Sequence, residues 1–229
     1  LRSSGLRGFD IPGTVEPLLA ALFADDTTAF LRDTDSLPDL LALLGRWCAA
    51  ARAKFNDDKT VILPVGTATY RERVCVQRRL TEAGPVIPSH FHIARDGEPT
   101  RILGAWLGNK IDQAVVWERM IDTVRTNLAR WGQRHPTMYG RKLIVDIELG
   151  ARTQFLARAQ GMPGPVLDTL QRIALRFVWK DETHARVNAD TVYRPVAEGG
   201  LNLLNLKHRQ DAIALQWLRE YLCLNGSRP

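Results

Sequence analysis

Two adjacent carboxylates, Asp25 and Asp26, separate two short apolar stretches at residues 22–24 and 27–31. Apolar stretches of this length are typical of strands, and aspartates are common in tight turns. The pattern therefore predicts a β-hairpin with both acids at its tip. Neighbouring carboxylates repel each other unless a cation or a shared proton compensates, and hard oxygen ligands suit Mg²⁺ or Mn²⁺. The pair alone leaves two interpretations open, a metal-binding hairpin tip and a solvated Asp–Asp turn.

The chain has 229 residues, of which 45% are hydrophobic and 24% are charged, which is enough for one large domain or two small ones. No apolar stretch approaches the roughly 20 residues that span a bilayer, so we expect no membrane segment. The first residues have no initiator Met and no apolar core of a signal peptide, and we expect a piece of a longer intracellular protein. Cys48, Cys75 and Cys223 are widely separated and odd in number, which argues against a disulfide framework and a clustered zinc site.

The positive charge of the chain is concentrated in its middle third. The net charge is +6, and the sequence pI is near 9.5. Lys plus Arg and Asp plus Glu number 13 and 13 in residues 1–109, 12 and 6 in residues 110–180, and 6 and 6 in residues 181–229. A basic segment beside a neutral one that carries acidic ligands suits a protein that grips a phosphate backbone near a metal site. Arginines that only solvate helix surfaces are an equal alternative on charge alone.

The first part of the chain predicts a small antiparallel sheet covered by one helix. Apolar residues at three- and four-residue spacing predict the helix over residues 37–51, which we expect to pack on the back of the sheet. The strand candidates are residues 6–11, 15–23, 27–31 and 60–63.

Residues 64–100 are rich in Pro, Gly, Arg and Thr and show weak periodicity, so we expect a loop-rich insertion with one short helix near residues 70–80. Residues 101–108 predict a strand or tight hairpin whose glycines allow close backbone approach.

The remaining sequence is dominated by helical periodicity, with loops at Gly140, at residues 161–164 and at Gly199-Gly200. The fold class is therefore α+β, a small sheet unit followed by a helical bundle. We expect four helices, at residues 111–131, 141–159, 165–179 and 208–222. The side chains expected to face inward in these helices are Val115, Trp117, Met120, Ile121, Val124, Leu128, Trp131, Ile144, Ile147, Ala151, Phe155, Leu156, Val166, Leu170, Ile173, Ala174, Phe177, Val178, Ala212, Ile213, Leu215, Leu218 and Leu222.

Several motifs occur in an order that resembles the last three palm motifs of a non-LTR (LINE-type) retrotransposon reverse transcriptase. These are Phe23-Ala24-Asp25-Asp26, the segment 53–60 after the first helix, and the segment 103–108. The sequence downstream also resembles the thumb and post-thumb region of that family, through Trp117, Trp131, Gly140-Arg141, Phe177-Val178-Trp179 and Gly199-Gly200-Leu201.

The resemblance implies a partial polymerase palm followed by a mostly helical thumb bundle. Residues 1–109 would be the C-terminal part of the palm, with residues 64–100 as an insertion. Residues 110–180 would be a basic helical thumb, and residues 181–229 a post-thumb loop and terminal helix. The resemblance implies a nuclear location for the protein, although the sequence carries no recognisable targeting signal.

The implied activity is RNA-directed DNA synthesis with two Mg²⁺ or Mn²⁺ ions, an RNA template, a DNA primer and deoxynucleoside triphosphates as partners. Asp25 would be the principal metal ligand of the hairpin, and Asp26 a secondary ligand or electrostatic partner. Lys59 would approach the triphosphate and donate a proton to pyrophosphate, or else be an exposed cation at the start of a strand.

The resemblance also assigns a primer-support hairpin to Leu103, Gly104, Trp106 and Gly108, although ordinary turn geometry explains the glycines too. The thumb would contact the sugar-phosphate backbone without reading its sequence. Trp106 is a candidate for base stacking, whereas core positions are favoured for Trp117, Trp131 and Trp179. The candidate backbone contacts are Arg119, Arg125, Arg130, Arg134, Arg141 and Lys142.

The chain departs from the family in lacking a further palm carboxylate and the finger residues, which we expect in an upstream region of the parent protein. Asp10 is not assigned that role, because its surroundings resemble the strand that leads to the hairpin. We therefore expect this chain alone to be inactive as a polymerase. A non-catalytic nucleic-acid-binding helical module, from a decayed or domesticated element, is the alternative, and a helical protein-interaction scaffold is a third.

Overall fold

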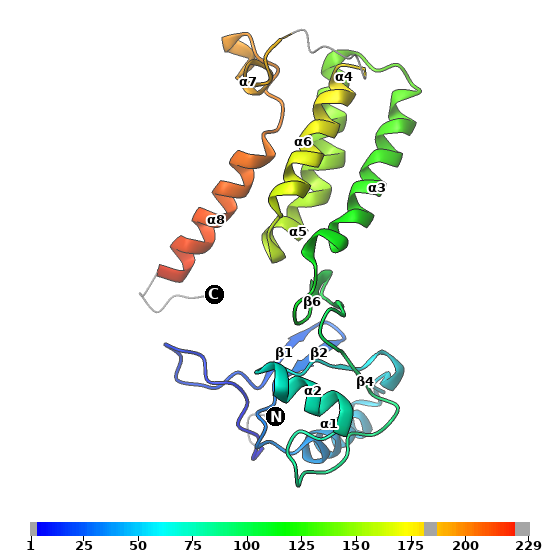
Figure 1. The fold of residues 1–229 in the computed structure, drawn as a ribbon, viewed down its shortest axis with the longest axis vertical. Helices are drawn as coiled ribbons and strands as arrows, with labels where there is room; N and C mark the ends of the chain where they lie inside the picture. Colours follow the sequence, from blue (N-terminus) through cyan, green and yellow to red (C-terminus); the bar gives the residue numbers. More distant parts are fainter. Residues whose placement is uncertain (1–3, 181–186, 223–229) are drawn as a thin grey trace. The chain divides into compact units, whose positions relative to one another are not determined.

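The computed structural model describes residues 4–180 and 187–222, and the chain divides into two compact units (Figure 1). Unit 1 consists of Leu1–Leu103 and Leu107–Ile111, and unit 2 consists of Gly104–Trp106 and Asp112–Pro229. Unit 1 contains most of the strands, and unit 2 is largely helical. The predicted α+β class is therefore confirmed. No helix in the described ranges is both long and apolar enough to cross a membrane.

The strands form three separate pairs rather than the single antiparallel sheet that was predicted. Strands β1 (Ala20–Phe23) and β2 (Asp26–Ala29) form an antiparallel hairpin. The predicted strand at 60–63 is shortened to β3 (Val61–Ile62) and runs parallel to β4 (His92–Ile93). Strands β5 (Thr100–Ile102) and β6 (Ala105–Leu107) form the third pair.

The strand predicted at residues 6–11 is reduced to one antiparallel bridge between Phe9 and Leu18. Gly8 precedes it with a φ of 62°, in the left-handed region, and a Cβ there would lie 2.4 Å from the Leu18 carbonyl oxygen. Only glycine tolerates both conditions, and this backbone is incompatible with a regular strand.

Helix α1 (Leu37–Ala51) has the predicted boundaries. The Ser36 side chain caps its first turn by accepting a hydrogen bond from the Asp39 N–H at 3.2 Å. Its Leu37 and Leu41 side chains pack against a core formed by residues 74–93. Because Leu22 and Phe23 remain 71% and 66% exposed, the expectation that this helix covers the back of the hairpin is wrong.

Residues 64–100 are rich in loops and contain one short helix, as predicted, and they also supply the core of unit 1. Helix α2 (Ala68–Gln77) falls near the predicted short helix and buries Val74 completely. Ile87, Phe91 and Ile93 come from the following loop and strand and are at most 6% exposed. These apolar residues follow no helix or strand period because most of them lie in irregular backbone, so periodicity could not identify them as core.

Unit 2 is built mainly on helices (Figure 1). They are α3 (Gln113–Gly132), α4 (Met138–Val145), α5 (Arg152–Gln160), α6 (Gly164–Val178), α7 (Ala189–Tyr193) and α8 (Leu206–Leu222). The core includes Trp117, Val124, Leu149, Leu170, Phe177 and Trp179. Trp117 and Trp179 are therefore core residues, as predicted.

A π-helical turn, η2 (Asp146–Ala151), joins α4 to α5 and explains an error in the predicted inward face. A π-helical turn holds more residues than an α-helical one, so the apolar periodicity changes phase across it. Val145 and Leu149 are buried, whereas Ile147 and Phe155, predicted to face inward, are 62% and 56% exposed.

The inserted turn also places a carboxylate inside unit 2. Glu148 is 6% exposed and accepts hydrogen bonds from Asn127 Nδ2 at 2.8 Å, Trp131 Nε1 at 3.2 Å and Arg152 Nε at 3.1 Å. Burial alone would raise the pKa of Glu148, but these hydrogen bonds and the Arg152 charge lower it below the usual value. Trp131 is 47% exposed although its indole N–H reaches this buried carboxylate, so its predicted core position is wrong.

The inward face predicted for the last helix is mostly exposed. Ile213 packs against the core of unit 2, whereas Leu215, Leu218 and Leu222 are each more than half exposed. Val115 of α3 is likewise exposed. A helix with apolar residues around its circumference gives no unique inward direction, which is why the face of α8 was misassigned.

The role of residues 64–100 can be tested with two adjacent side chains. Ile87 is 1% exposed and Val86 is 55% exposed. We expect Ile87→Ala to lower the free energy of unfolding of unit 1 by about 2–5 kcal/mol, because it leaves a cavity, and Val86→Ala to change it by less than ~0.5 kcal/mol. Urea denaturation, monitored through hydrogen exchange of the unit 1 amides, measures the free energy of unfolding of each variant. Equal effects of the two substitutions would contradict a core in this segment.

Candidate functional site

The two acids lie at the tip of the β1–β2 hairpin, as predicted. Phe23 pairs with Asp26, so only Ala24 and Asp25 form the turn. Ala24 has a φ of 52°, a left-handed conformation that two-residue hairpin turns require and that is strained for alanine. Both carboxylates are exposed. The tight turn thus presents two neighbouring carboxylates to solvent on a short paired scaffold.

The segments on either side of the hairpin are tied together by the buried carboxylate of Asp35. It accepts hydrogen bonds from the backbone N–H groups of Arg7 at 2.8 Å, Gly8 at 3.0 Å and Arg32 at 2.9 Å. Arg32 adds a hydrogen bond from its Nε to the Gly8 carbonyl at 2.5 Å and an ion pair with Asp10. These contacts hold the chain before β1 against the chain after β2.

Asp35 was not identified from the sequence, where it falls in a predicted loop. Its donors lie up to 28 positions away, so no local pattern reports them. Burial alone would raise the pKa of Asp35, but the hydrogen bonds from Arg7, Arg32 and Gly8 and the Arg32 charge lower it below 3.8. This carboxylate therefore stays ionised and serves as the structural support of the hairpin.

The donor set at the hairpin suits a hard cation only in part. Two adjacent aspartates supply the oxygen ligands that Mg²⁺ and Mn²⁺ prefer. Within residues 4–180 and 187–222, however, no group of three or more His, Cys, Asp or Glu side chains is arranged to hold a metal ion. Asp25 and Asp26 would thus be two ligands of a site that needs more.

Lys59 is exposed at the end of a short 3-10 turn, η1 (Asp57–Lys59). The Asn56 side chain caps this turn by accepting a hydrogen bond from the Lys59 N–H at 3.3 Å. The backbone of Lys59 is therefore fixed, and its ammonium group is free to meet solvent or an anion.

The residues of the predicted primer-support hairpin have contacts of their own. Leu103 and Gly104 form the turn between β5 and β6 with φ values of 49° and 87°. A Cβ at Gly108 would lie 2.5 Å from the Glu98 carbonyl oxygen, so this glycine permits close backbone packing. Trp106 packs against the core of unit 2, and its backbone N–H donates to Gln160 Oε1 at 2.9 Å. These contacts account for the two glycines and Trp106 as structural residues.

Two of the side chains predicted to contact the nucleic-acid backbone, Arg141 and Lys142, already bind partners within unit 2. Arg141 is 6% exposed, donates from Nη1 to the Phe177 carbonyl at 2.6 Å and from Nε to the Pro136 carbonyl at 3.2 Å, and stacks over the Phe177 ring. Lys142 pairs with Asp146 at 2.6 Å. The buried guanidinium binds the end of α6, so Arg141 is corrected from a nucleic-acid contact to a packing residue.

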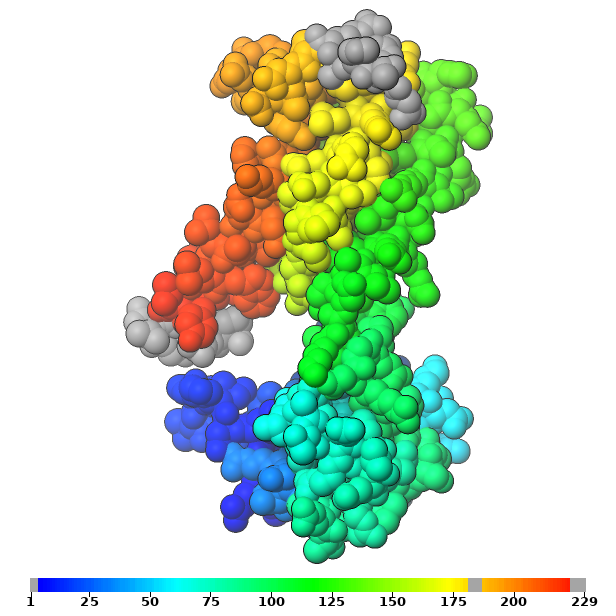
Figure 2. All heavy atoms as spheres, in the orientation of Figure 1, coloured from blue at the N-terminus to red at the C-terminus, as the bar shows by residue number. Residues whose placement is uncertain are grey.

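Four exposed arginines remain on or beside α3, whose surface is coloured green in Figure 2. Arg119 and Arg130 are eleven positions apart, about three turns or ~16 Å, and therefore share one face. Arg125 lies about 120° around the axis from Arg119 and approaches Asp122 at 3.4 Å. The face opposite the buried Trp117, Ile121 and Leu128 is thus basic at Arg119 and Arg130.

Neither a protein-family model nor a curated protein matches the chain.

The lowered pKa values in unit 1 predict a loss of stability in acid. Asp35 is one carboxyl with a lowered pKa, and Asp96 is another. The pKa of Asp96 is lowered to about 2, first by its hydrogen bonds with Arg71 and then by Lys110. Because unfolded aspartates titrate near 3.8, the unfolded chain binds more protons below that pH, and protonation favours unfolding. The stabilisation is complete above about pH 5 and is lost as the pH falls from about 4 towards 2.

Urea midpoints of unit 1 at pH 5 and pH 3 measure this loss. We expect Asp35→Asn to lower the midpoint at pH 5 and to reduce its fall between the two pH values, because one lowered carboxyl is removed. Asp58→Asn, at an exposed carboxylate, is the matched control. A wild-type midpoint that rises on acidification would contradict the assignment.

Proposed function

We propose that this chain is the C-terminal palm and thumb part of an RNA-directed DNA polymerase of the non-LTR retrotransposon type, and that it binds RNA–DNA duplex. The observation that carries the proposal is the adjacent pair Asp25–Asp26 at an exposed, tight hairpin tip, directly after Phe23 and Ala24. The proposal assigns the palm to residues 1–109 and the thumb to residues 110–180.

The chemistry of this function needs oxygen ligands for Mg²⁺ or Mn²⁺. When bound, such ions activate the primer 3′-hydroxyl and stabilise charge on the phosphoryl group. Asp25 would hold the principal ligand position and Asp26 the secondary one, because both carboxylates project from one tight turn. Lys59 would hold the proton that the leaving pyrophosphate takes up, since its ammonium group is exposed.

Two carboxylates provide too few ligands for a polymerase centre, and the described part of the chain contains no group of three. The remaining carboxylate and the fingers would come from an upstream region of the parent protein. We therefore expect the isolated chain to bind template–primer duplex without extending it.

Duplex binding would depend on the basic face of α3. Arg119 and Arg130 lie ~16 Å apart along the axis, so each would reach a different phosphate of the duplex. Phosphate contacts of this kind position a duplex without reading its sequence.

A non-catalytic nucleic-acid-binding module is the second candidate. It is favoured because the hairpin supplies only two acids and the described residues contain no group of three side chains that could hold a metal ion. Both candidates use the basic face of α3, and they differ in whether Asp25 and Asp26 bind a cation.

Substitutions on one helix test the duplex contact. We expect Arg119→Ala combined with Arg130→Ala to weaken RNA–DNA duplex binding and to reduce the slope of log K against log salt by about 2, because two phosphate contacts are lost. Fluorescence anisotropy from about 50 to 200 mM salt measures both quantities.

Arg125→Ala is the matched control, because it removes the same charge from another side of the same helix. We expect Arg125→Ala to change the slope by clearly less than Arg119→Ala or Arg130→Ala does alone. Binding that responds equally to Arg125→Ala, or that does not weaken with salt, would contradict the proposed use of this face.

A further inference from the structure

A polar hollow lies in unit 1, and none of its lining residues belongs to the β1–β2 hairpin. It encloses about 380 Å³ and is open to solvent. Its lining contains two arginines, two histidines and no acidic residue. The residues are Cys75, Arg78, Ser89, His90, Phe91, His92, Ile93 and Arg95.

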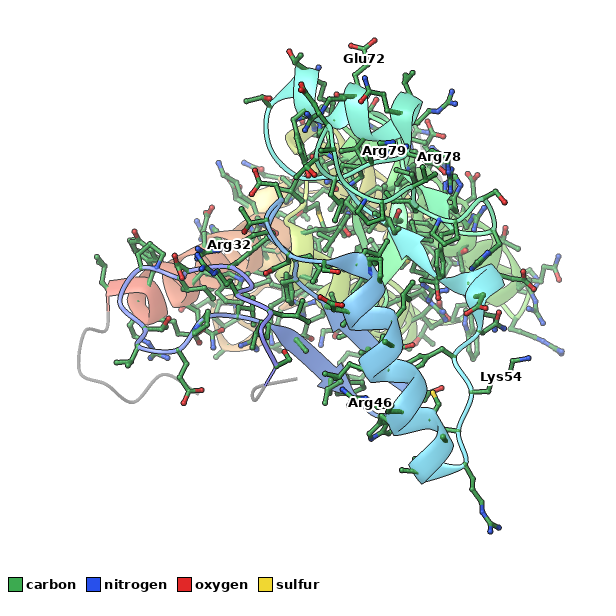
Figure 3. The ribbon with its side chains drawn as sticks, turned by 90° about the horizontal axis from the view of Figure 1, so that it is seen from below. Arg32, Arg46, Lys54, Glu72, Arg78 and Arg79 are labelled. Atoms are coloured by element: carbon green, nitrogen blue, oxygen red, sulfur yellow. The ribbon has the colours of Figure 1, made fainter. Side chains whose placement is uncertain are left out.

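Arg78 provides a fixed cation in the wall of this hollow. It ends α2, where Figure 3 labels it beside Arg79, and its backbone is left-handed with a φ of 52°. Its Nε donates to the Ile87 carbonyl at 3.2 Å, and its Nη2 donates to the Pro88 and Phe91 carbonyls at 2.6 and 2.7 Å. Carbonyls orient a guanidinium without neutralising it, and Nη1 makes none of these bonds. The positive charge is therefore held in place before any ligand arrives.

The acids nearest the hollow are already engaged. Glu98 contacts His92 Nε2 at 2.5 Å and accepts from the Arg95 backbone N–H at 3.1 Å. Asp96 pairs with Arg71 at 2.7 Å and with Lys110 at 3.2 Å. The Arg95 side chain is exposed beside them. Positive charge at Arg78 and Arg95 thus remains available to a ligand.

A metal ion does not fit this lining. Cys75, His90 and His92 do not form a group that could hold a metal ion, and no such group occurs in the described ranges. Burial raises the pKa of the Cys75 thiol, which points at the Ala94 carbonyl with Sγ 3.8 Å away. A protonated thiol is a poor metal ligand.

We propose that this hollow binds a phosphate group, with Arg78 and Arg95 as its cations and with Ser89 and His90 as further hydrogen-bonding groups. Forked guanidinium donors match phosphate oxygens, and a pre-oriented arginine loses little entropy on binding. The phosphate belongs to a free phosphomonoester or to a nucleic-acid backbone, which share this chemistry. The inference is independent of the proposed function, because it uses neither Asp25, Asp26 nor the face of α3.

Titration of the whole chain with inorganic phosphate, a nucleoside monophosphate and a short single-stranded oligonucleotide tests the site. We expect saturable shifts of the backbone amide resonances of residues 89–95 with at least one of these probes. The arms distinguish the source, since a response to the oligonucleotide alone identifies a backbone phosphate, and a response to the small probes identifies a free one.

Arg95→Ala should weaken that binding at least about tenfold, because it removes one charge-assisted contact from an exposed position that does not support the fold. The matched control is Arg46→Ala, which removes an exposed charge from α1, a separate element of unit 1 (Figure 3), and should change binding less than about twofold. Absence of saturable shifts with all three probes, or equal weakening by both substitutions, would overturn the proposal.

Discussion

The Asp35 carboxylate is the contact on which the candidate site depends, because it joins the chain segments before and after the β1–β2 hairpin. A hairpin of two four-residue strands is marginally stable in water. Three backbone N–H groups converge on Asp35, which ties the base of the hairpin. The same principle recurs where Arg78 binds three loop carbonyls and where Arg141 binds the end of α6. In each case one charged side chain binds backbone groups of loops or of a helix end and so fixes them in place.

The elements that could be predicted from sequence are those with a strong local signal. Helix α1 has a Ser36 cap and a regular apolar stripe, and the Asp pair marks a tight turn between two short strands. The errors arise where distant contacts decide the outcome. The π-helical turn shifts the phase that placed Phe155 inward, and the core of residues 64–100 lies largely in loops without a period. Asp35 was missed because two of its three donors, Arg7 and Gly8, lie far away in sequence.

The candidate functional residues divide in the same way. The pattern placed Asp25 and Asp26 at a hairpin tip because turn chemistry is local. Arginines, in contrast, could not be sorted by sequence, because a guanidinium serves equally well on a phosphate or on a buried carbonyl. Arg119 and Arg130 remain exposed, whereas Arg141 is used for packing. The proposed polymerase ancestry therefore rests on the hairpin and on the exposed face of α3, and the polar hollow at Arg78 adds a separate place for a phosphate.

The most direct test of the central claim is whether the two hairpin acids bind a divalent cation. Titration with Mn²⁺ should broaden the amide resonances of residues 23–28 in a saturable way, because the ion's unpaired electrons relax nearby nuclei. We expect weak Mn²⁺ affinity, broadening confined to the hairpin, and its loss when Asp25→Asn and Asp26→Asn are combined. Broadening that the double substitution leaves unchanged, or an unresponsive hairpin, would contradict a metal-binding origin of the pair.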